Sequence, residues 1–130
     1  MTDWQSQFIR FGVAGAIGFL VDAGVLYAAL WLGAGPHIGR VISFFCAAIV
    51  TWRINRRFTF TTDTGRSAWR EWIEYLIAMS AGGVVNYLAY AVALSLVHDG
   101  AYRPAAAVAI GSLAGMCVNF TAAKFWAFRH

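Results

Sequence analysis

Charged residues are scarce in this chain. Only 12% of its 130 residues are Asp, Glu, Lys or Arg, whereas an ordinary soluble domain carries about 25%. Hydrophobic residues make up 60% of the chain, and the mean hydropathy is +0.60. A soluble protein of this size would leave much of that apolar surface in water. The composition therefore argues against a soluble domain and indicates a membrane protein.

Residues that carry enzyme chemistry are also few. The two cysteines, Cys46 and Cys117, both fall inside apolar segments, where the role of a buried hydrophobic residue is favoured over a disulfide or a metal site. The sequence contains no His/Cys/carboxylate cluster, no Gly-rich phosphate loop and no Ser/His/Asp arrangement. We therefore expect a protein that is not an enzyme and that holds no metal or cofactor.

Four apolar stretches are long enough to cross a bilayer, which takes about 20 residues of helix. They cover approximately Phe8–Leu32, Ile38–Phe60, Trp72–Val97 and Arg103–Phe128. The first stretch is longer than the h-region of a signal peptide and is followed by no convincing cleavage site, so we interpret it as retained. Short connections favour antiparallel neighbours. The predicted fold is an all-α membrane protein whose single domain covers residues 1–130.

Basic residues gather on one side of the predicted spans. Eight of the ten lie near the termini or in and beside the middle connection, and two lie in the other connections. The first group is Arg10, Arg53, Arg56, Arg57, Arg66, Arg70, Lys124 and Arg129, and the second is Arg40 and Arg103. The positive-inside rule then places both termini and a loop of about residues 61–71 in the cytoplasm. Because these charges lie at membrane edges, we expect the cytoplasmic (inner) membrane as location and no nucleic-acid partner.

The second half of the chain repeats the first. Offsets of 64 and 68 residues bring polar residues, glycines and both prolines into register. The matched pairs include Gly18 and Gly82, Asp22 and Asn86, Pro36 and Pro104, Thr51 and Asn119, and Arg56 and Lys124. We predict two helical hairpins of the same orientation, at about residues 8–60 and 72–128. Parallel internal repeats of this kind are frequent in transporters.

Several polar residues lie within the apolar stretches. A charge at the centre of a membrane helix costs about 2.5–3.5 kcal/mol, so Asp22 needs a partner, water or a proton, and Arg40 is its candidate partner. Two roles stay open, namely attachment between helices and a polar cavity or proton-coupling site. Glycine stripes on the same helices are explained by close helix packing in lipid. The candidate intramembrane polar residues are Asp22, Arg40, Thr51, Asn86 and Asn119.

The stretch TWRINRRFTF, residues 51–60, ends the second span with three arginines. Arg53 and Arg56 are three residues apart and share a helical face, with Asn55 beside them. Arg53 lies deeper than a topology anchor requires. Guanidinium groups bind phosphate in a bidentate manner, more strongly where water is scarce. The pattern predicts a lipid-phosphate site at Arg53, Asn55 and Arg56, whereas Arg57 fits a membrane anchor.

Over nearly its whole length the chain resembles the GtrA family of small four-helix membrane proteins. The resemblance is carried by FIRFGVAGAIGFLVD near the start, INRRFTF after the second span and VNFTAAKFWAF at the end of the fourth. Lys124 stands where the family often has another basic residue, which makes it a further candidate phosphate contact. Ala123 replaces the asparagine that the first half has at Asn55. The resemblance implies translocation of a polyprenyl-phosphate-linked sugar for cell-surface polysaccharide synthesis, often beside a polyprenyl-phosphate glycosyltransferase.

Two other functions fit parts of the sequence. One is a non-transporting membrane anchor for a glycosyltransferase, which would use the middle loop and its basic flanks. The other is a small proton-coupled drug exporter with Asp22 as its coupling acid. The arginines disfavour an exporter because they would repel a cationic drug. Since four helices are a thin wall for a translocation path, we expect a homo-oligomer.

Overall fold

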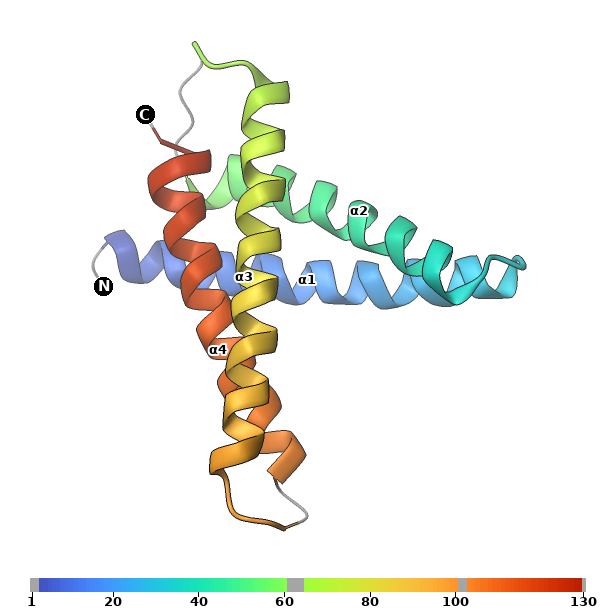
Figure 1. The fold of residues 1–130 in the computed structure, drawn as a ribbon. Helices are drawn as coiled ribbons and strands as arrows, with labels where there is room; N and C mark the ends of the chain where they lie inside the picture. Colours follow the sequence, from blue (N-terminus) through green and yellow to red (C-terminus); the bar gives the residue numbers. More distant parts are fainter. Residues whose placement is uncertain (1–2, 61–64, 101–102, 130) are drawn as a thin grey trace. The chain divides into compact units, whose positions relative to one another are not determined.

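The computed structural model describes residues 3–60, 65–100 and 103–129 of the chain. Residues 61–64 of the predicted cytoplasmic loop lie outside this description. Over the described ranges the chain forms helices and no strand, which confirms the all-α prediction (Figure 1). The elements are α1 (Asp3–Trp31), α2 (Pro36–Ile54), η1 (Asn55–Thr59), α3 (Ala68–Leu96), α4 (Arg103–Ala122) and η2 (Ala123–Ala127), where η denotes a π-helix.

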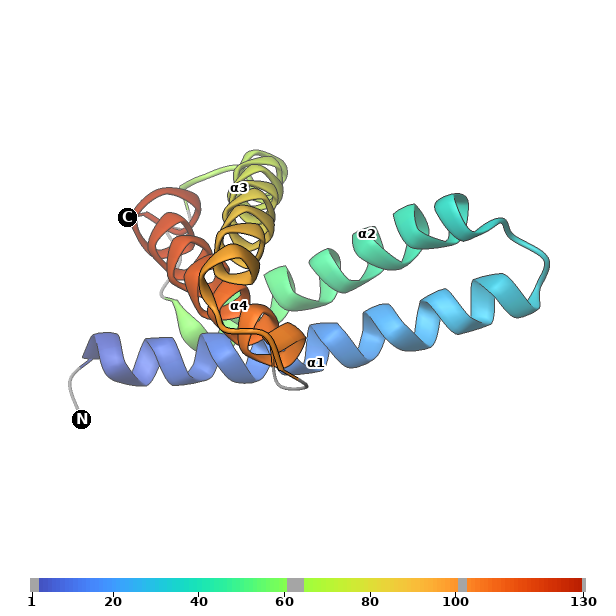
Figure 2. The same ribbon diagram turned by 60° about the horizontal axis from the view of Figure 1, so that its bottom comes forward.

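The chain divides into two compact units, each of which is a helical hairpin. In the first hairpin, α1 packs against α2 and η1, and in the second, α3 packs against α4 and η2. Figures 1 and 2 show the two helices of each pair side by side, joined by a short connection at one end. The α1–α2 turn contains Gly33 at a φ of 97°, a backbone conformation that glycine adopts without steric cost. The same orientation of the two hairpins in the membrane stays a prediction.

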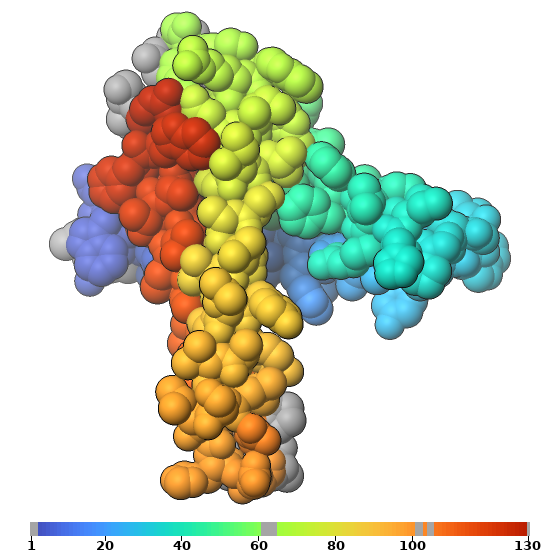
Figure 3. Space-filling model, in the orientation of Figure 1, coloured from blue at the N-terminus to red at the C-terminus, as the bar shows by residue number. Residues whose placement is uncertain are grey.

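All four long helices suit a membrane. Each contains a span long and apolar enough to cross a bilayer, and only 11–28% of the residues in the most apolar window of each span are buried inside the protein. The 29 residues of α1 extend about 43 Å, more than the ~30 Å of a hydrocarbon core. Large apolar side chains such as Phe19 (71% exposed) and Leu20 (69%) face outward. In Figure 3, no other part of the chain covers the face of α3 (yellow) that is turned toward the viewer. The chain is a multi-pass membrane protein.

The helix boundaries differ by a few residues from the expected ones, for local reasons. α3 starts at Ala68 rather than Trp72 because the Ser67 side chain caps it, accepting a hydrogen bond from the Arg70 backbone N–H at 3.4 Å. α2 starts at Pro36, since proline suits the first helical turn, where its missing N–H has no intrahelical role. The predicted loop of residues 61–71 is thus shorter than expected, because its last four residues are helical.

Each hairpin ends in one turn of π-helix, at positions that match at the offset of 68 residues. In the first hairpin, the Phe60 N–H donates to the Asn55 carbonyl oxygen at 2.9 Å, and in the second the Phe128 N–H donates to the Ala123 oxygen at 2.8 Å. Both bonds join residues five apart, as in a π-helix. Such turns are frequent at functional sites, and here they lie at the ends of the two hairpins and contain Arg56 and Lys124.

An aromatic pair closes each hairpin beside its π-helix. The Phe11 and Phe60 rings meet edge to face with centroids 6.2 Å apart. Tyr75 and Phe128 meet in the same manner at 5.7 Å. All four side chains are buried, and the two pairs match at offsets of 64 and 68 residues. Aromatic pairs of this geometry contribute about 0.5–1.5 kcal/mol beyond the area that they bury, so each π-helix is fixed to the first helix of its own hairpin.

Candidate functional site

The basic end of the first hairpin presents its arginines outward. Arg53, in the last turn of α2, is exposed and has no hydrogen bond or ion pair among the described residues. The Arg56 guanidinium carbon lies 5.7 Å from the centroid of the Trp52 ring, and that of Arg57 lies 5.4 Å from the Phe58 ring. Cation–π contacts of this kind orient a guanidinium without neutralising its charge. The exposed guanidinium of Arg53 therefore keeps its positive charge available to an anion.

Asn55 plays a different part from the arginines around it. Its side chain is buried, with 1% of the residue exposed, and its Oδ1 accepts a hydrogen bond from Thr59 Oγ1 at 2.8 Å. Both residues belong to η1, so this bond stabilises the π-helical turn from inside. The sequence predicted that Asn55 contacts the phosphate directly. In the structure its buried side chain instead supports the turn that carries Arg56 and Arg57.

The last carbonyl groups of η1 need donors, because a helix end leaves its carbonyl oxygens without intrahelical partners. Arg10 of α1 supplies one donor, with its Nη1 2.9 Å from the Phe58 oxygen. This hydrogen bond joins the start of the first span to the end of the second. Arg10 therefore helps to hold the η1 end against α1.

Asp22 and Arg40 form the intramembrane pair that the sequence indicated. Arg40 Nη1 lies 2.5 Å from Asp22 Oδ1 and 3.4 Å from Ser43 Oγ. The pair links α1 and α2 in the halves of these helices that are nearer to the turn between them. The Asp22 side chain is 21% exposed and that of Arg40 is 57% exposed. A pairing partner inside the hairpin removes most of the cost of placing the carboxylate in the membrane.

The other intramembrane polar residues of the first hairpin serve packing. Thr51 of α2 faces Gly18 of α1 so closely that a Cβ added at Gly18 would collide with the Thr51 methyl group. The Thr51 hydroxyl donates to the Ala48 carbonyl oxygen at 3.1 Å. Gly15, by contrast, would accommodate a Cβ with nothing within 4 Å. Of these two glycines, only Gly18 is required by a close approach of the helices.

In the second hairpin, two asparagines pack against glycines of the facing helix. Asn119 of α4 lies against Gly82 of α3, and its buried Oδ1 has no hydrogen-bond partner within the described part of the chain. Asn86 of α3 lies between Gly111 and Gly115, where an added Cβ would come within 2.7–2.8 Å of its atoms. At these two contacts the α3–α4 interface is therefore closely packed.

Lys124 of η2 holds its charge over aromatic rings. Its Nζ lies 5.9 Å from the centroid of Phe120 and 5.5 Å from that of Phe125. Lys124 matches Arg56 in the first hairpin, whose guanidinium also lies over an aromatic ring one turn earlier. The two matched basic residues are thus placed alike within their own hairpins, beside the π-helix.

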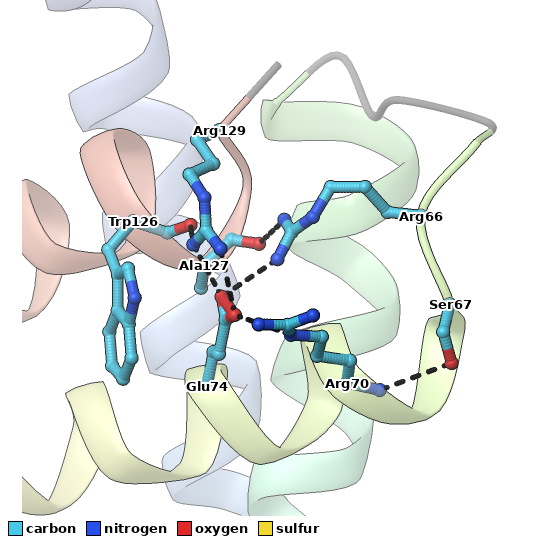
Figure 4. Close-up of polar contacts among 7 residues, drawn as sticks. All are labelled: Arg66, Ser67, Arg70, Glu74, Trp126, Ala127 and Arg129. Carbon is cyan, nitrogen blue, oxygen red and sulfur yellow. Dashed lines mark hydrogen bonds and ion pairs between the residues drawn. The ribbon is translucent and has the colours of Figure 1, made fainter.

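The sequence did not indicate the strongest polar cluster of the structure, which surrounds Glu74 near the start of α3 (Figure 4). Arg129 binds this carboxylate with both Nη atoms, at 2.6 and 3.0 Å, and Arg66 Nη2 lies 2.8 Å from it. Arg70, four residues before Glu74 on the same helix, makes a longer contact of 3.6 Å with it. The Glu74 side chain is only 9% exposed. Three guanidinium groups therefore converge on one buried carboxylate, which we call the Glu74 cluster.

The Glu74 cluster also caps η2. Arg66 Nη1 lies 2.6 Å from the Ala127 oxygen, and Arg129 Nη1 lies 2.6 Å from the Trp126 oxygen. Hydrogen bonding to Glu74 raises the pKa of Arg129 above its ordinary value, so this arginine stays charged. Glu74 matches Arg10 at the offset of 64 residues, and this charge reversal within the repeat is the sequence signal that could have revealed the cluster.

Within the described residues, no group of three or more His, Cys, Asp or Glu side chains is arranged to hold a metal ion. A family model described as "GtrA/DPMS, transmembrane domain" matches residues 10–128. The match covers most of both hairpins and every candidate site residue above except Arg129, which follows its last residue. It confirms the family resemblance that the sequence motifs carried.

Proposed function

Because this chain belongs to the GtrA/DPMS transmembrane-domain family, with a membrane function related to polyprenyl-phosphate sugars, we propose that it translocates a polyprenyl-phosphate-linked sugar across the cytoplasmic membrane. In this proposal the phosphate binds at the basic end of the first hairpin, and the polyprenyl chain stays in the lipid. The chain acts as a carrier for cell-surface polysaccharide synthesis and performs no covalent chemistry.

The observation that carries the proposal is the placement of Arg53. Its guanidinium is exposed in the last α-helical turn of a membrane span, with no ion-pair partner among the described residues. Lipid phosphates lie at the ends of such spans, and a guanidinium there binds a phosphate with two parallel hydrogen bonds. Arg56 adds a second positive charge, and Asn55 holds the turn that carries it. Lys124 is the matching basic residue of the second hairpin.

Translocation also needs a path for the sugar. The close contacts of Gly82 with Asn119 and of Asn86 with two glycines block such a path at the middle of the α3–α4 interface. In this proposal the headgroup therefore crosses that level along a surface outside this helix pair. A homo-oligomer would supply the second wall of that path, and the outward-facing apolar side chains of the helices are available for such an assembly.

The pairing of Asp22 argues against drug export. A coupling acid must bind a proton or a cationic drug, and here Arg40 already occupies the carboxylate at 2.5 Å. The role as a glycosyltransferase anchor is a separate alternative, which differs from the proposal in one measurable respect. An anchor would bind its enzyme without moving lipid.

Purified protein reconstituted into proteoliposomes tests the proposal. A polyprenyl-phosphate sugar placed in one leaflet should reach the other leaflet faster than in liposomes without protein. Accessibility of the sugar to a membrane-impermeant periodate reagent reports the movement. A rate equal to that of empty liposomes, with correctly folded protein in the membrane, contradicts translocation. If the same preparation then co-purifies with a polyprenyl-phosphate glycosyltransferase, the anchor role replaces the proposal.

A further inference from the structure

The Glu74 cluster has more positive charge than its own carboxylate neutralises. Three guanidinium groups surround Glu74. Glu71, a second carboxylate one turn earlier on α3, is itself buried, with 1% of the residue exposed. Among the described residues, three arginines therefore stand against two carboxylates. Such an excess beside a low-dielectric phase attracts an anion.

The three arginines are not equally engaged. Arg66 and Arg129 each donate both to Glu74 and to a carbonyl oxygen at the end of η2, which fixes their guanidinium planes. Arg70 is different. Its side chain is 75% exposed, and its Nε lies 3.6 Å from Glu74, beyond the distance of a normal hydrogen bond. Its N–H groups are therefore available to an external acceptor.

The position of the Glu74 cluster indicates what that acceptor is. Arg70 is the third residue of the α3 span, Arg66 comes two residues before this span, and Arg129 comes two residues after the end of the α4 span. All three guanidinium groups thus lie at the ends of membrane spans, where lipid phosphates are found. Two tryptophans at this level, Trp69 (71% exposed) and Trp126 (37%), have the placement of interfacial aromatic residues.

We propose that Arg70, together with the fixed guanidinium groups of Arg66 and Arg129, forms a phosphate-binding site in the second hairpin. The ligand is the phosphate group of an anionic lipid. Arg70 supplies the mobile donor, and the two fixed arginines supply a preorganised positive field. Glu74 has a double role, because it holds the two fixed arginines in place and competes with the phosphate for their charge. This site is separate from the one at Arg53 and does not depend on translocation.

A titration of the full-length protein in detergent micelles with dihexanoyl phosphatidylglycerol tests the site, with inorganic phosphate as the second ligand. Arg70→Gln should raise the dissociation constant of the lipid about five- to tenfold, since a charge-assisted hydrogen bond is lost at a partly exposed position. Its fold should be unchanged, because the Arg70 side chain makes only a long contact. Arg57→Gln is the matched control, as it removes one exposed arginine beside the first hairpin's π-helix.

Glu74→Gln separates a ligand site from a purely structural cluster. Provided that circular dichroism shows native helix content, this variant should bind the lipid more tightly, because it removes the competing charge. Arg53→Lys should leave the Arg70-dependent part of the binding intact, so failure of the first-hairpin site and failure of this one are distinguishable. Arg70-dependent binding of the lipid alone assigns the site to a headgroup, and equal binding of inorganic phosphate assigns it to phosphate in general. Unchanged affinity in Arg70→Gln, or an equal loss in Arg57→Gln, would overturn the proposal.

Discussion

The two hairpins have the same backbone form at their basic ends but differ in whether a carboxylate pairs with the arginines there. Each ends in a π-helical turn, packed through an aromatic pair onto the first helix of its hairpin. At the end of the first hairpin, one arginine, Arg10, caps a carbonyl oxygen, and Arg53 is exposed. At the end of the second, Arg66 and Arg129 cap the carbonyl oxygens and both bind Glu74.

This difference shows how one repeated scaffold acquires two roles. Matched positions carry Arg10 in the first hairpin and Glu74 in the second, so the charge at the start of the first helix is reversed. Among the described residues of the first hairpin, no carboxylate forms an ion pair with Arg53, which leaves its charge for a ligand. In the second hairpin the carboxylate fixes two arginines and makes the π-helical end more rigid. We infer that the first end binds the phosphate of the translocated lipid, and that the second end, which carries the separate site at Arg70, is the more stable one.

The largest expected effect is loss of the carboxylate at Glu74. Glu74→Ala should destabilise the protein by about 3 kcal/mol, at the lower end of the ~3–5 kcal/mol for breaking a buried ion pair, because Arg129 is 39% exposed. Arg10→Ala, at the matched position, should cost no more than about 1 kcal/mol, since it removes one hydrogen bond at the surface. Unfolding in mixed micelles with increasing SDS measures both values. Equal losses in the two variants would remove the proposed difference in rigidity.

A smaller effect is expected at the close helix contact in each hairpin. Gly82→Ala should cost about 1–3 kcal/mol, because its Cβ would collide with Asn119. Adding Asn119→Ala should restore most of that loss. Gly18→Ala with Thr51→Ala is the parallel pair in the first hairpin, and Gly83→Ala is the control, since nothing lies within 4 Å of a Cβ there. The same unfolding measurement applies. If the second substitution does not rescue the first, the contact does not limit the approach of the helices.

The spans and the short-range pairings could be predicted from the sequence. Apolar length predicts all four helices, because no other secondary structure satisfies a single apolar segment's backbone in lipid. The pairing of Asp22 with Arg40 follows from the cost of an isolated charge in a membrane. Arg70 and Glu74 are four residues apart on one helix, so their contact follows from helical geometry alone.

The rest depends on contacts between residues distant in sequence or on a backbone form that leaves no clear pattern. Arg129 meets Glu74 across 55 positions, and only the packing of α3 against η2 brings them together. The π-helical turns also could not be predicted from the sequence. One starts at Asn55 and the other at Ala123, so the two turns share no residue type at their first position. For that reason Asn55 was expected to face a ligand, whereas it supports the turn from inside.

The binding of lipid phosphate by arginine variants of the first hairpin tests the central claim most directly. Lysine keeps the charge that topology requires but lacks the bidentate geometry of a guanidinium. We therefore expect Arg53→Lys and Arg56→Lys to weaken binding of a short-chain polyprenyl phosphate about tenfold or more at normal membrane levels. Arg57→Lys, the anchor control, should bind as the unaltered protein does. Equal affinity in all three variants would show that the arginines serve only as an anchor and would contradict the phosphate site.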